Sequence, residues 1–355
     1  MSVSIRSNKR ILIIGPYPPP YGGVSIHIFR FYNLLKEEFF FDFIDESPNK
    51  KSDFFNIRGL NIFGYLKKIG NSDILYVHSG SNLIRILHLL VGRIYSKKII
   101  LVLHGFTSKP PKFIFYINGL IYRLATTIIV VNGDIRKRLY LSEKKSIIKE
   151  AFIPPFLIDE LELPENILKL ICQSKRNGKI IICSNAFRLK KYMNQDLYGL
   201  DMCIEVAKRL VNKEISFIFI FVVSSVAEKN ETYLKMETLI KELNLEKHFF
   251  LINENLSFVK LMQQSDIVIR PTNTDGDSLT IREGLFLNKK VLASDVVQRP
   301  EGVILFENRN MNDLEKKLVE LISAGDKVNG KMYQQDHENL HKTLKKFYCH
   351  LIDNL

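Results

Sequence analysis

Two carboxylates stand eight positions apart in the last third of the chain, around a short turn. Asp275 lies directly before the segment GDSLTIREGLFLNKKVLAS (276–294), and Glu283 lies within it. Ser278 or Thr280 can cap a helix that begins after the turn, and free backbone N–H groups at a helix start bind phosphate oxygens. A carboxylate one to two turns into that helix can accept hydrogen bonds from hydroxyl groups. The pattern predicts a site for a phosphorylated, hydroxyl-rich ligand, although these residues by themselves fit surface charge equally well.

A glycine pair near the N-terminus marks a second place where phosphate can bind. Gly22 and Gly23 follow a proline-stiffened loop, GPYPPPY (15–21), and stand where a helix is expected to begin. Glycine lets a ligand approach the backbone closely, and helix-start amides attract anions. The spacing matches neither the dinucleotide nor the P-loop fingerprint. A purely structural tight turn is the alternative.

Two histidines and a basic cluster follow predicted strands, at the strand ends where open α/β sheets bind ligands. His104 ends the run LVLHG and is expected to be functional, whereas His78 ends LYVHSG and is expected to be a packed, hydrogen-bonded residue. Arg188, Lys190 and Lys191 follow the first strand of the second half, where cations can hold a diphosphate. A solvated basic loop is the alternative for this cluster.

Two successive parallel-sheet domains are predicted to position these residues. Short apolar runs alternate with helical patterns, as expected for strands buried on both faces of a parallel sheet. The expected strands lie at 10–15, 73–80, 97–105, 126–133, 146–155, 179–187, 214–223, 248–255, 265–271, 289–294 and 302–307, with domain punctuation at 153–155 and 172–179. A length of 355 residues also favours two domains. We therefore expect an N-terminal domain over 1–165, a C-terminal domain over 166–330 and a helical tail over 331–355.

Composition narrows the class of protein. A hydrophobic content of 46% suits a globular chain, no apolar run is long enough to cross a bilayer, and the N-terminus has no signal-peptide pattern. The four cysteines form no CxxC pair, which favours reduced thiols in the cytoplasm. The net charge of +13 is concentrated in residues 1–150, which hold 23 Lys and Arg against 10 Asp and Glu. Such a basic half attracts nucleic acid, anionic lipid or a phosphorylated substrate, and charge alone does not choose among them.

Taken together, these motifs resemble those of the family 4 glycosyltransferases. The signature of that family is Glu-x7-Glu, and here Asp275 replaces the first Glu. Gly22 and Gly23 resemble the family's N-terminal Gly-Gly loop, LVLHG resembles the strand that ends in an active-site His, and Arg188 matches the Arg that grips the donor diphosphate. The partner Lys of that Arg aligns with Tyr198, a departure for which Lys190 or Lys191 is a candidate replacement. The signature itself is carried by PTNTDGDSL (271–279), EGL (283–285) and VLAS (291–294).

The resemblance implies a GT-B fold, in which two Rossmann-like parallel-sheet domains face a cleft and the C-terminal helix returns to the N-terminal domain. It implies retaining transfer from a nucleotide-diphosphate sugar, with no metal or other cofactor. The catalytic residues would be His104, Asp275 and Arg188, and no side-chain nucleophile is needed because the leaving phosphate serves as the base. Glu283 would hold the ribose, and Asp275 would contact the transferred sugar or its leaving phosphate. The remaining donor-binding residues would be Gly22, Gly23, Lys190, Lys191, Gly276, Ser278, Leu279 and Thr280.

The basic N-terminal domain would carry the acceptor. Two basic stretches, KPPKFIFYINGLIYRL (109–124) and DIRKRLYLSEKK (134–145), suit peripheral contact with an anionic membrane, unless they form a solvated face. We expect a glycan or polyprenyl-diphosphate-linked acceptor, in O-antigen or capsule assembly, at the inner face of the cytoplasmic membrane of a bacterium. A nucleic-acid partner is not expected, because no nucleic-acid-binding motif is present. The alternatives are a catalytically degenerate sugar-nucleotide binder or scaffold, and a nucleotide-sugar epimerase of the same fold.

Overall fold

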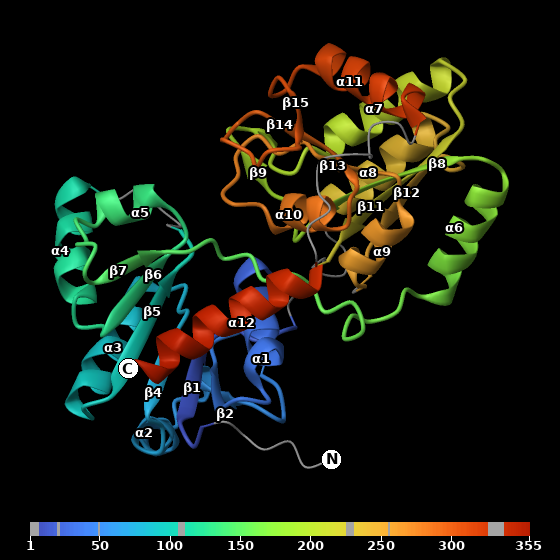
Figure 1. Cartoon of the computed structure of the whole chain (residues 1–355). Helices are drawn as coiled ribbons and strands as arrows, with labels where there is room; N and C mark the ends of the chain where they lie inside the picture. The colour runs from blue at the N-terminus through green and yellow to red at the C-terminus, as the bar shows by residue number, and fades with distance from the viewer. Residues whose placement is uncertain are drawn as a thin grey trace. The chain divides into compact units, whose positions relative to one another are not determined.

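The chain forms two compact units, each an α/β unit as expected. A computed structural model describes residues 7–19, 22–48, 50–105, 111–224, 231–254, 256–325 and 337–355. The first unit comprises Met1–Ile153 and Glu338–Leu355, and the second comprises Pro154–His337 (Figure 1). The division falls within the Ile-Pro-Pro segment at 153–155. Parts of the stretches named above lie outside the described residues: Pro20 and Tyr21, Lys109 and Pro110, residue 255 of an expected strand, and residues 326–336.

A parallel sheet of seven strands, in the order β3-β2-β1-β4-β5-β6-β7, forms the centre of the first unit. Its strands are β1 (Arg10–Gly15), β2 (Phe40–Asp45), β3 (Phe55–Asn56), β4 (Ile74–Val77), β5 (Lys98–Leu103), β6 (Thr127–Val130) and β7 (Ser146–Ile148). β1 pairs with β2 on one side and with β4 on the other, so the strand order reverses there. A ligand of such a sheet binds beyond the carboxyl ends of the strands at this reversal.

Helices cover this sheet on both faces. They are α1 (Gly23–Leu35), the 3-10 helix η1 (Ile57–Gly59), α2 (Ile62–Gly70), α3 (Asn82–Ile94), α4 (Lys112–Tyr122) and α5 (Gly133–Arg138). Residues of α2 to α5 share one apolar layer with the sheet. On the other face, Phe31 of α1 stacks on Tyr76 of β4 with 4.1 Å between ring centroids.

The C-terminal helix α12 (His337–Asp353) belongs to the first unit, which confirms the expectation that it returns to the N-terminal domain (Figure 1). The Tyr348 ring meets Phe31 edge-on at 5.1 Å. The Lys9 ammonium donates to the carbonyl of Ile352 at 2.8 Å. The helix therefore completes the layer that α1 begins.

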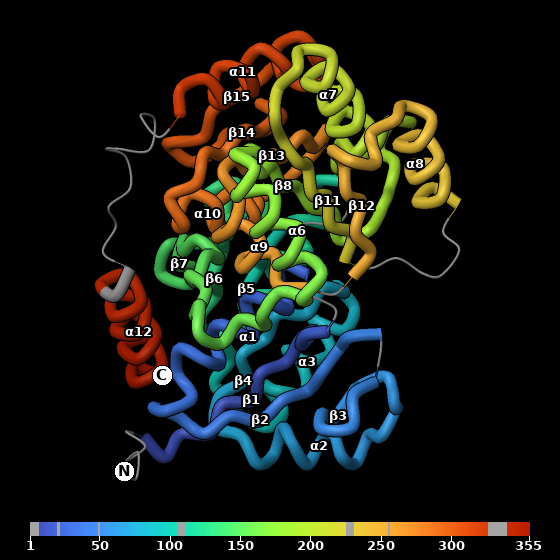
Figure 2. Tube along the Cα trace, turned by 90° about the vertical axis from the view of Figure 1, so that its right-hand side faces the viewer, coloured from blue at the N-terminus to red at the C-terminus, as the bar shows by residue number. Residues whose placement is uncertain are grey.

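The second unit is built on a parallel sheet of six strands in the order β12-β11-β8-β13-β14-β15 (Figure 2). A separate antiparallel hairpin of two strands accompanies this sheet. The sheet strands are β8 (Ile180–Ala186), β11 (Phe217–Val223), β12 (Phe249–Ile252), β13 (Ile267–Arg270), β14 (Lys290–Ser294) and β15 (Ile304–Phe306). The hairpin consists of β9 (Lys191–Tyr192) and β10 (Gln195–Asp196). Strand order reverses between β8 and β13, which makes the ends of these two strands the expected ligand position.

Two apolar layers enclose this second sheet. One layer includes residues of α7 (Leu200–Asn212), α8 (Glu231–Glu242) and α11 (Met311–Ser323). The other includes residues of α6 (Glu165–Arg176), α9 (Phe258–Gln264) and α10 (Leu279–Phe286). In the parts of the chain that the structure describes, every helix is too short or too polar to cross a lipid bilayer.

Candidate functional site

The turn after β13 and the start of α10 bring most of the predicted donor residues together. Ser278, one of the two residues predicted to cap α10, is its N-cap residue, but its side chain makes no capping hydrogen bond. Its hydroxyl oxygen is buried and has no hydrogen-bond partner among the described residues. The helix start therefore keeps its amides and a buried hydroxyl available to a ligand, which is the arrangement expected at an anion site.

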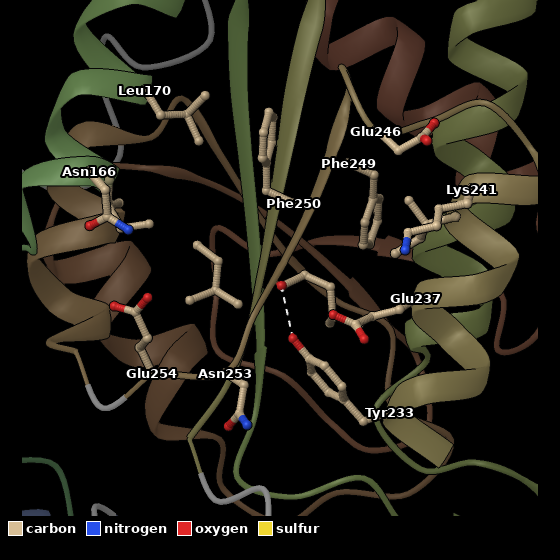
Figure 3. Close-up of a pocket in the computed structure, with 14 residues that line it drawn as sticks. Asn166, Leu170, Tyr233, Glu237, Lys241, Glu246, Phe249, Phe250, Asn253 and Glu254 are labelled. Carbon is tan, nitrogen blue, oxygen red and sulfur yellow. Dashed lines mark hydrogen bonds between the residues drawn. The ribbon is translucent and has the colours of Figure 1, made fainter. Parts of the chain in front are cut away.

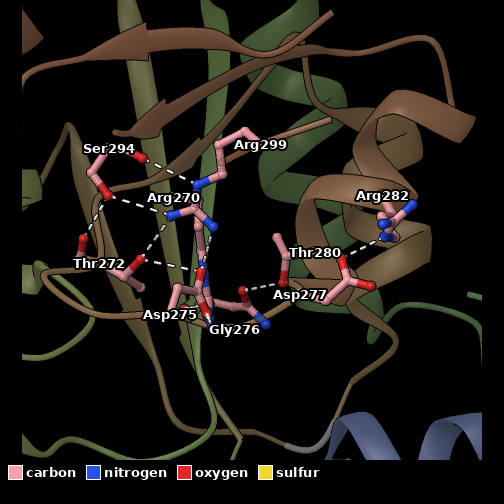
Figure 4. Close-up of polar contacts among 10 residues, drawn as sticks. Arg270, Thr272, Asp275, Gly276, Asp277, Thr280, Arg282, Ser294 and Arg299 are labelled. Atoms are coloured by element: carbon pink, nitrogen blue, oxygen red, sulfur yellow. Dashed lines mark hydrogen bonds and ion pairs between the residues drawn. The ribbon is translucent and has the colours of Figure 1, made fainter. Parts of the chain in front are cut away.

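Asp275 lies at the centre of a buried polar cluster (Figure 4). We call Arg270, Arg299 and Asp275 the arginine pair with its carboxylate. Arg299 Nη1 lies 2.9 Å from Asp275 Oδ2, and Arg270 Nε lies 3.3 Å from the same oxygen. Thr272 donates its hydroxyl to Asp275 at 3.2 Å. The Arg299 side chain is only 2% exposed, and those of Arg270 and Asp275 are 11% exposed.

The charges in this cluster do not balance. Two guanidinium groups contact one carboxylate, so these three side chains together carry one positive charge in excess, in a nearly buried place. Burial alone would raise the pKa of Asp275, but Arg270 and Arg299 outweigh burial and lower it below its usual value. Asp275 is therefore ionised at neutral pH. A buried excess of positive charge is costly unless an anion compensates it, which points to a negatively charged ligand.

The first turns of α10 carry the other predicted contacts. Thr280 donates its hydroxyl to Asn185 Oδ1 at 2.9 Å, which ties α10 to the end of β8. Glu283 is buried at 4% exposure, as Thr280 is at 6%. The sequence alone left surface charge as the alternative for Glu283. The burial of this carboxylate disagrees with that alternative. Its role in holding a ribose stays a prediction.

The basic cluster after β8 leads into a hairpin rather than directly into a helix. Lys191 is part of β9, and Arg188, Lys190 and Lys191 are all exposed. The Arg188 guanidinium lies over the Phe187 ring at 6.0 Å from its centroid. Their exposure leaves these cations free to approach a diphosphate, and their donor-binding roles stay predictions.

Two arginines in this region were not singled out from the sequence, and one of them lies beside the predicted Tyr198. Arg270 and Arg299 were missed, although an arginine that ends the buried strand IVIR is a detectable signal. The Arg270 guanidinium lies 5.0 Å from the centroid of the Tyr198 ring, close enough for a cation–π contact. Tyr198 thus has a cation beside it, at the position where the family that the sequence resembles has a Lys.

In the first unit, the glycine pair stands at the start of α1. Gly22 is the N-cap residue with an extended backbone (φ −107°), and its amide donates to the Ser25 hydroxyl at 2.8 Å. A Cβ at Gly23 would meet no atom within 4 Å, and one at Gly22 would meet only Ser25 at 3.9 Å, among the described residues. Neither packing nor φ therefore demands glycine, and the space beside the pair suits a ligand.

His104 lies in a cluster of three imidazoles at the ends of β4 and β5 and on α1. His78 Nδ1 and His104 Nε2 are 2.9 Å apart. His27 lies in α1, and its ring centroid is 5.2 Å from that of His78 and 5.0 Å from that of His104. Burial is the main cause that lowers the pKa of each ring, to about 4 for His27 and well below the usual value for His78 and His104. All three rings are therefore neutral at pH 7.

Among the described residues, the three imidazoles form a group that could bind a metal ion. One ring nitrogen from each lies within 4.8 Å of the others, and neutral imidazoles can bind zinc. The surrounding charge opposes a cation, because Arg30 acts on His27 and Arg85 acts on His104 to disfavour positive charge there. The resemblance found in the sequence predicts that no metal is needed, and this stays a prediction.

A large pocket of the second unit lies apart from the predicted site residues, and its charge is unsuitable for a diphosphate. It has a volume of about 640 Å³ and is lined by residues of α6, α8 and the edge strand β12 (Figure 3). The Tyr233 hydroxyl donates to the carbonyl of Leu251 at 3.0 Å in its wall. Glu237, Glu246 and Glu254 line it against a single Lys241, a balance that repels a diphosphate. None of the predicted site residues lines this pocket.

Comparison with known proteins agrees with the fold. No protein-family profile matches the chain. A poly(ribitol-phosphate) alpha-N-acetylglucosaminyltransferase of Staphylococcus aureus is 27% identical over 132 residues, which cover 35% of this chain and 26% of that protein. The match thus spans about a quarter of that relative's length.

Solved structures match over nearly the full chain. HepE of Anabaena in complex with UDP-glucose has a TM-score of 0.71 at 12% identity, with 98% of this chain and 100% of that chain covered. A glycosyltransferase from Rickettsia africae has a TM-score of 0.66 at 18% identity, with 95% and 93% covered. At these identities the likeness shows the fold, which is the GT-B fold of glycosyltransferases.

Proposed function

We propose that this protein is a glycosyltransferase that takes a sugar from a nucleotide-diphosphate sugar. The observation that carries the proposal is the buried positive excess of Arg270 and Arg299 over Asp275, next to a helix start whose Ser278 hydroxyl has no partner among the described residues. A diphosphate supplies the negative charge that this arrangement lacks. Glu283, buried in the same helix, supplies a carboxylate for sugar hydroxyls.

Within this proposal the transfer is retaining and needs no metal at the diphosphate. Helix-start amides and guanidinium groups stabilise the charge that develops on the leaving diphosphate, which is the task that a metal ion performs elsewhere. Arg188, Lys190 and Lys191 add exposed cations after β8. The leaving phosphate takes the proton of the attacking hydroxyl.

The acceptor in this proposal is a glycan or a lipid-linked glycan of bacterial surface polysaccharide. The S. aureus relative acts on poly(ribitol-phosphate), a polyanion, and the first unit of this protein carries the excess of positive charge. An anionic acceptor, such as a polyprenyl-diphosphate-linked glycan, suits that charge.

Contact with an anionic membrane is supported by apolar side chains that face solvent on two neighbouring helices. On α3 they are spaced along one face, and on α4 they repeat the same helical spacing. The two sets are Leu83, Leu87, Leu90 and Ile94, and Phe113, Tyr116, Ile117 and Leu120. Exposed basic residues, Arg93, Lys112 and Arg123, lie on or at the ends of the same helices. An apolar face with a basic surround is the pattern of a peripheral membrane helix.

The experiment that tests the donor site is calorimetric titration with UDP, UDP-glucose, UDP-N-acetylglucosamine, GDP and ADP, each with and without EDTA. One nucleotide class should bind, with equal affinity in EDTA. Glu283→Gln should weaken binding by about 10- to 100-fold, because it removes hydrogen bonds to a charged group. Glu242→Gln, at an exposed position of the same unit, should bind as the unchanged protein does. If no nucleotide binds, or Glu283→Gln binds equally well, the proposed donor site is wrong.

A second candidate function is a catalytically degenerate sugar-nucleotide binder. The observation that favours it is the engagement of the Asp275 carboxylate by two arginines. Hydrolysis or transfer of a radiolabelled sugar from the bound donor separates the two functions, because a binder would retain the nucleotide sugar intact.

A further inference from the structure

The hydrogen bond between two histidines restricts what His104 can offer to a ligand. His78 follows β4 and His104 follows the neighbouring strand β5, so their rings meet at the carboxyl edge of the sheet. His78 Nδ1 and His104 Nε2 are 2.9 Å apart, so one of these two nitrogens donates and the other accepts. His104 is the least buried of the three rings, and its Nδ1 is the nitrogen left for a ligand.

Hydrogen-bond accounting assigns the direction of this bond. If His104 donated, His78 would carry its proton on Nε2, which is buried without a partner among the described residues. A buried N–H without an acceptor is rarer and costlier than a bare lone pair. If His78 donates instead, its Nε2 holds only a lone pair. His27 shows the same pattern, because its Nδ1 can only donate to the carbonyl of Ala151, at 2.8 Å, and its Nε2 is then bare.

We propose that His78 is a positioning residue that holds His104 as a neutral ring with its proton on Nδ1. His104 then presents an N–H donor to an oxygen of a ligand bound at the carboxyl edge of the first sheet, and it does not act as a general base. This role of His104 toward a ligand rests on the proposed function, whereas the effect of His78 on the ring does not. Sequence had favoured a purely packed role for His78.

The surroundings of the pair keep it uncharged. His27 and Arg85 both disfavour positive charge on His104, and burial acts in the same direction and is the largest cause that lowers its pKa. Arg85 is itself held by the Tyr122 hydroxyl and by the carbonyl of Ser79, so its guanidinium stays in place. In a ring that remains neutral, the hydrogen bond from His78 selects which nitrogen carries the proton, and this fixes the donor that faces a ligand.

The test is long-range nitrogen–proton NMR of protein labelled with 15N-histidine, with His104 assigned by its absence in His104→Asn. The unchanged protein should show His104 with its proton on Nδ1 at pH 7. His78→Leu removes the donor, and His104 should shift to a mixture or to the Nε2-protonated form. His78→Asn keeps an N–H near the Nδ1 position and should preserve the tautomer. His248→Leu, a change in the second unit, serves as the control and should leave the His104 tautomer unchanged.

Two outcomes would overturn the proposal: a His104 proton on Nε2 in the unchanged protein, or the same tautomer in His78→Leu as without the change. The His104 tautomer of the unchanged protein is measured without any variant, so it tests the proposal even if His78→Leu fails to fold. In transfer assays, His78→Leu should lower kcat/KM by about 10- to 100-fold, and His78→Asn should recover most of that loss. The expected tautomer without any transfer activity would refute the proposed function alone.

Discussion

At the residue scale, the arginine pair with its carboxylate explains why the predicted Asp275 differs from an ordinary surface acid. Its carboxylate is shared by Arg270, Arg299 and Thr272, and the amide of Gly276 also donates to it, at 3.1 Å. The ion pairs are nearly buried, so loss of one partner leaves a charge without compensation. The stability of the second unit should therefore depend on this carboxylate.

Asp275→Asn should destabilise the second unit by about 3–5 kcal/mol at neutral pH, because it leaves two buried guanidinium groups without a counter-charge. The pKa of Asp275 is lowered in the folded state, so its contribution is present above the ordinary value of 3.8 and is lost as pH falls through the folded value. Urea unfolding between pH 6 and pH 3 should show the difference from the unchanged protein shrinking toward pH 3. A difference that stays constant, or an equal effect of the exposed Asp159→Asn, would contradict this account.

At the element scale, a glycine at the start of α7 fixes how that helix meets the end of β13. Gly199 has a left-handed backbone (φ +68°), and a Cβ there would lie 2.3 Å from the carbonyl oxygen of Pro271. Pro271 directly follows Arg270, so any shift there moves the arginine pair. The close approach of Gly199 to Pro271 therefore helps to couple the helix start to the donor site.

Gly199→Ala should destabilise the second unit by about 2–4 kcal/mol, through backbone strain together with the clash, and should weaken nucleotide binding. Gly178→Ala is the matched control, because its φ of +66° is nearly the same but no atom lies within 4 Å of the added Cβ. That control should cost only about 1–2 kcal/mol, from the left-handed backbone alone. Thermal unfolding and UDP titration of both variants measure the two effects, and equal losses would show that the contact with Pro271 is unimportant.

The elements also show where sequence patterns were insufficient. The hairpin turn at Met193 and Asn194 has positive φ at both residues (49° and 59°), a geometry usually marked by Asn-Gly. Met-Asn gives no such signal, so the hairpin was read as part of a loop. The end of α6 was likewise read as punctuation over 172–179, because its polar C-terminal turn hides an apolar face that only packing reveals.

At the scale of the whole molecule, the lopsided charge and the apolar faces of α3 and α4 combine in the first unit. Charge on its own was ambiguous between nucleic acid, lipid and phosphorylated substrate. The exposed apolar side chains favour lipid, because insertion of apolar groups adds to electrostatic attraction at an anionic surface. Ile94 is 78% exposed at the end of one such face.

Ile94→Glu should reduce co-sedimentation with vesicles of phosphatidylglycerol and phosphatidylcholine, because it places a negative charge on the proposed membrane face. Ile158→Glu is the control, since that side chain is 93% exposed in the second unit. Binding of the unchanged protein should fall with added salt and with removal of phosphatidylglycerol. Equal binding of both variants, or binding to phosphatidylcholine alone, would contradict a membrane face on α3 and α4.

The sequence by itself determined the fold class, the GT-B resemblance and the order of the motifs along the chain. Buried parallel strands are read from local apolar runs, and the turn, cap and carboxylate around Asp275 and Glu283 are neighbours in sequence, so short-range physics was enough. The net positive charge of the N-terminal half also follows from the sequence alone, because it only requires counting charged residues.

Only the tertiary structure decided which distant residues share a site. Arg299 reaches Asp275 from 24 positions away, and His27, His78 and His104 meet because the strand order reverses at β1 and β4. No local pattern records such contacts, because they arise when parallel strands align their carboxyl ends. For the same reason the excess of buried positive charge, and the hydrogen bond that orients His104, are properties of packing and not of any single segment.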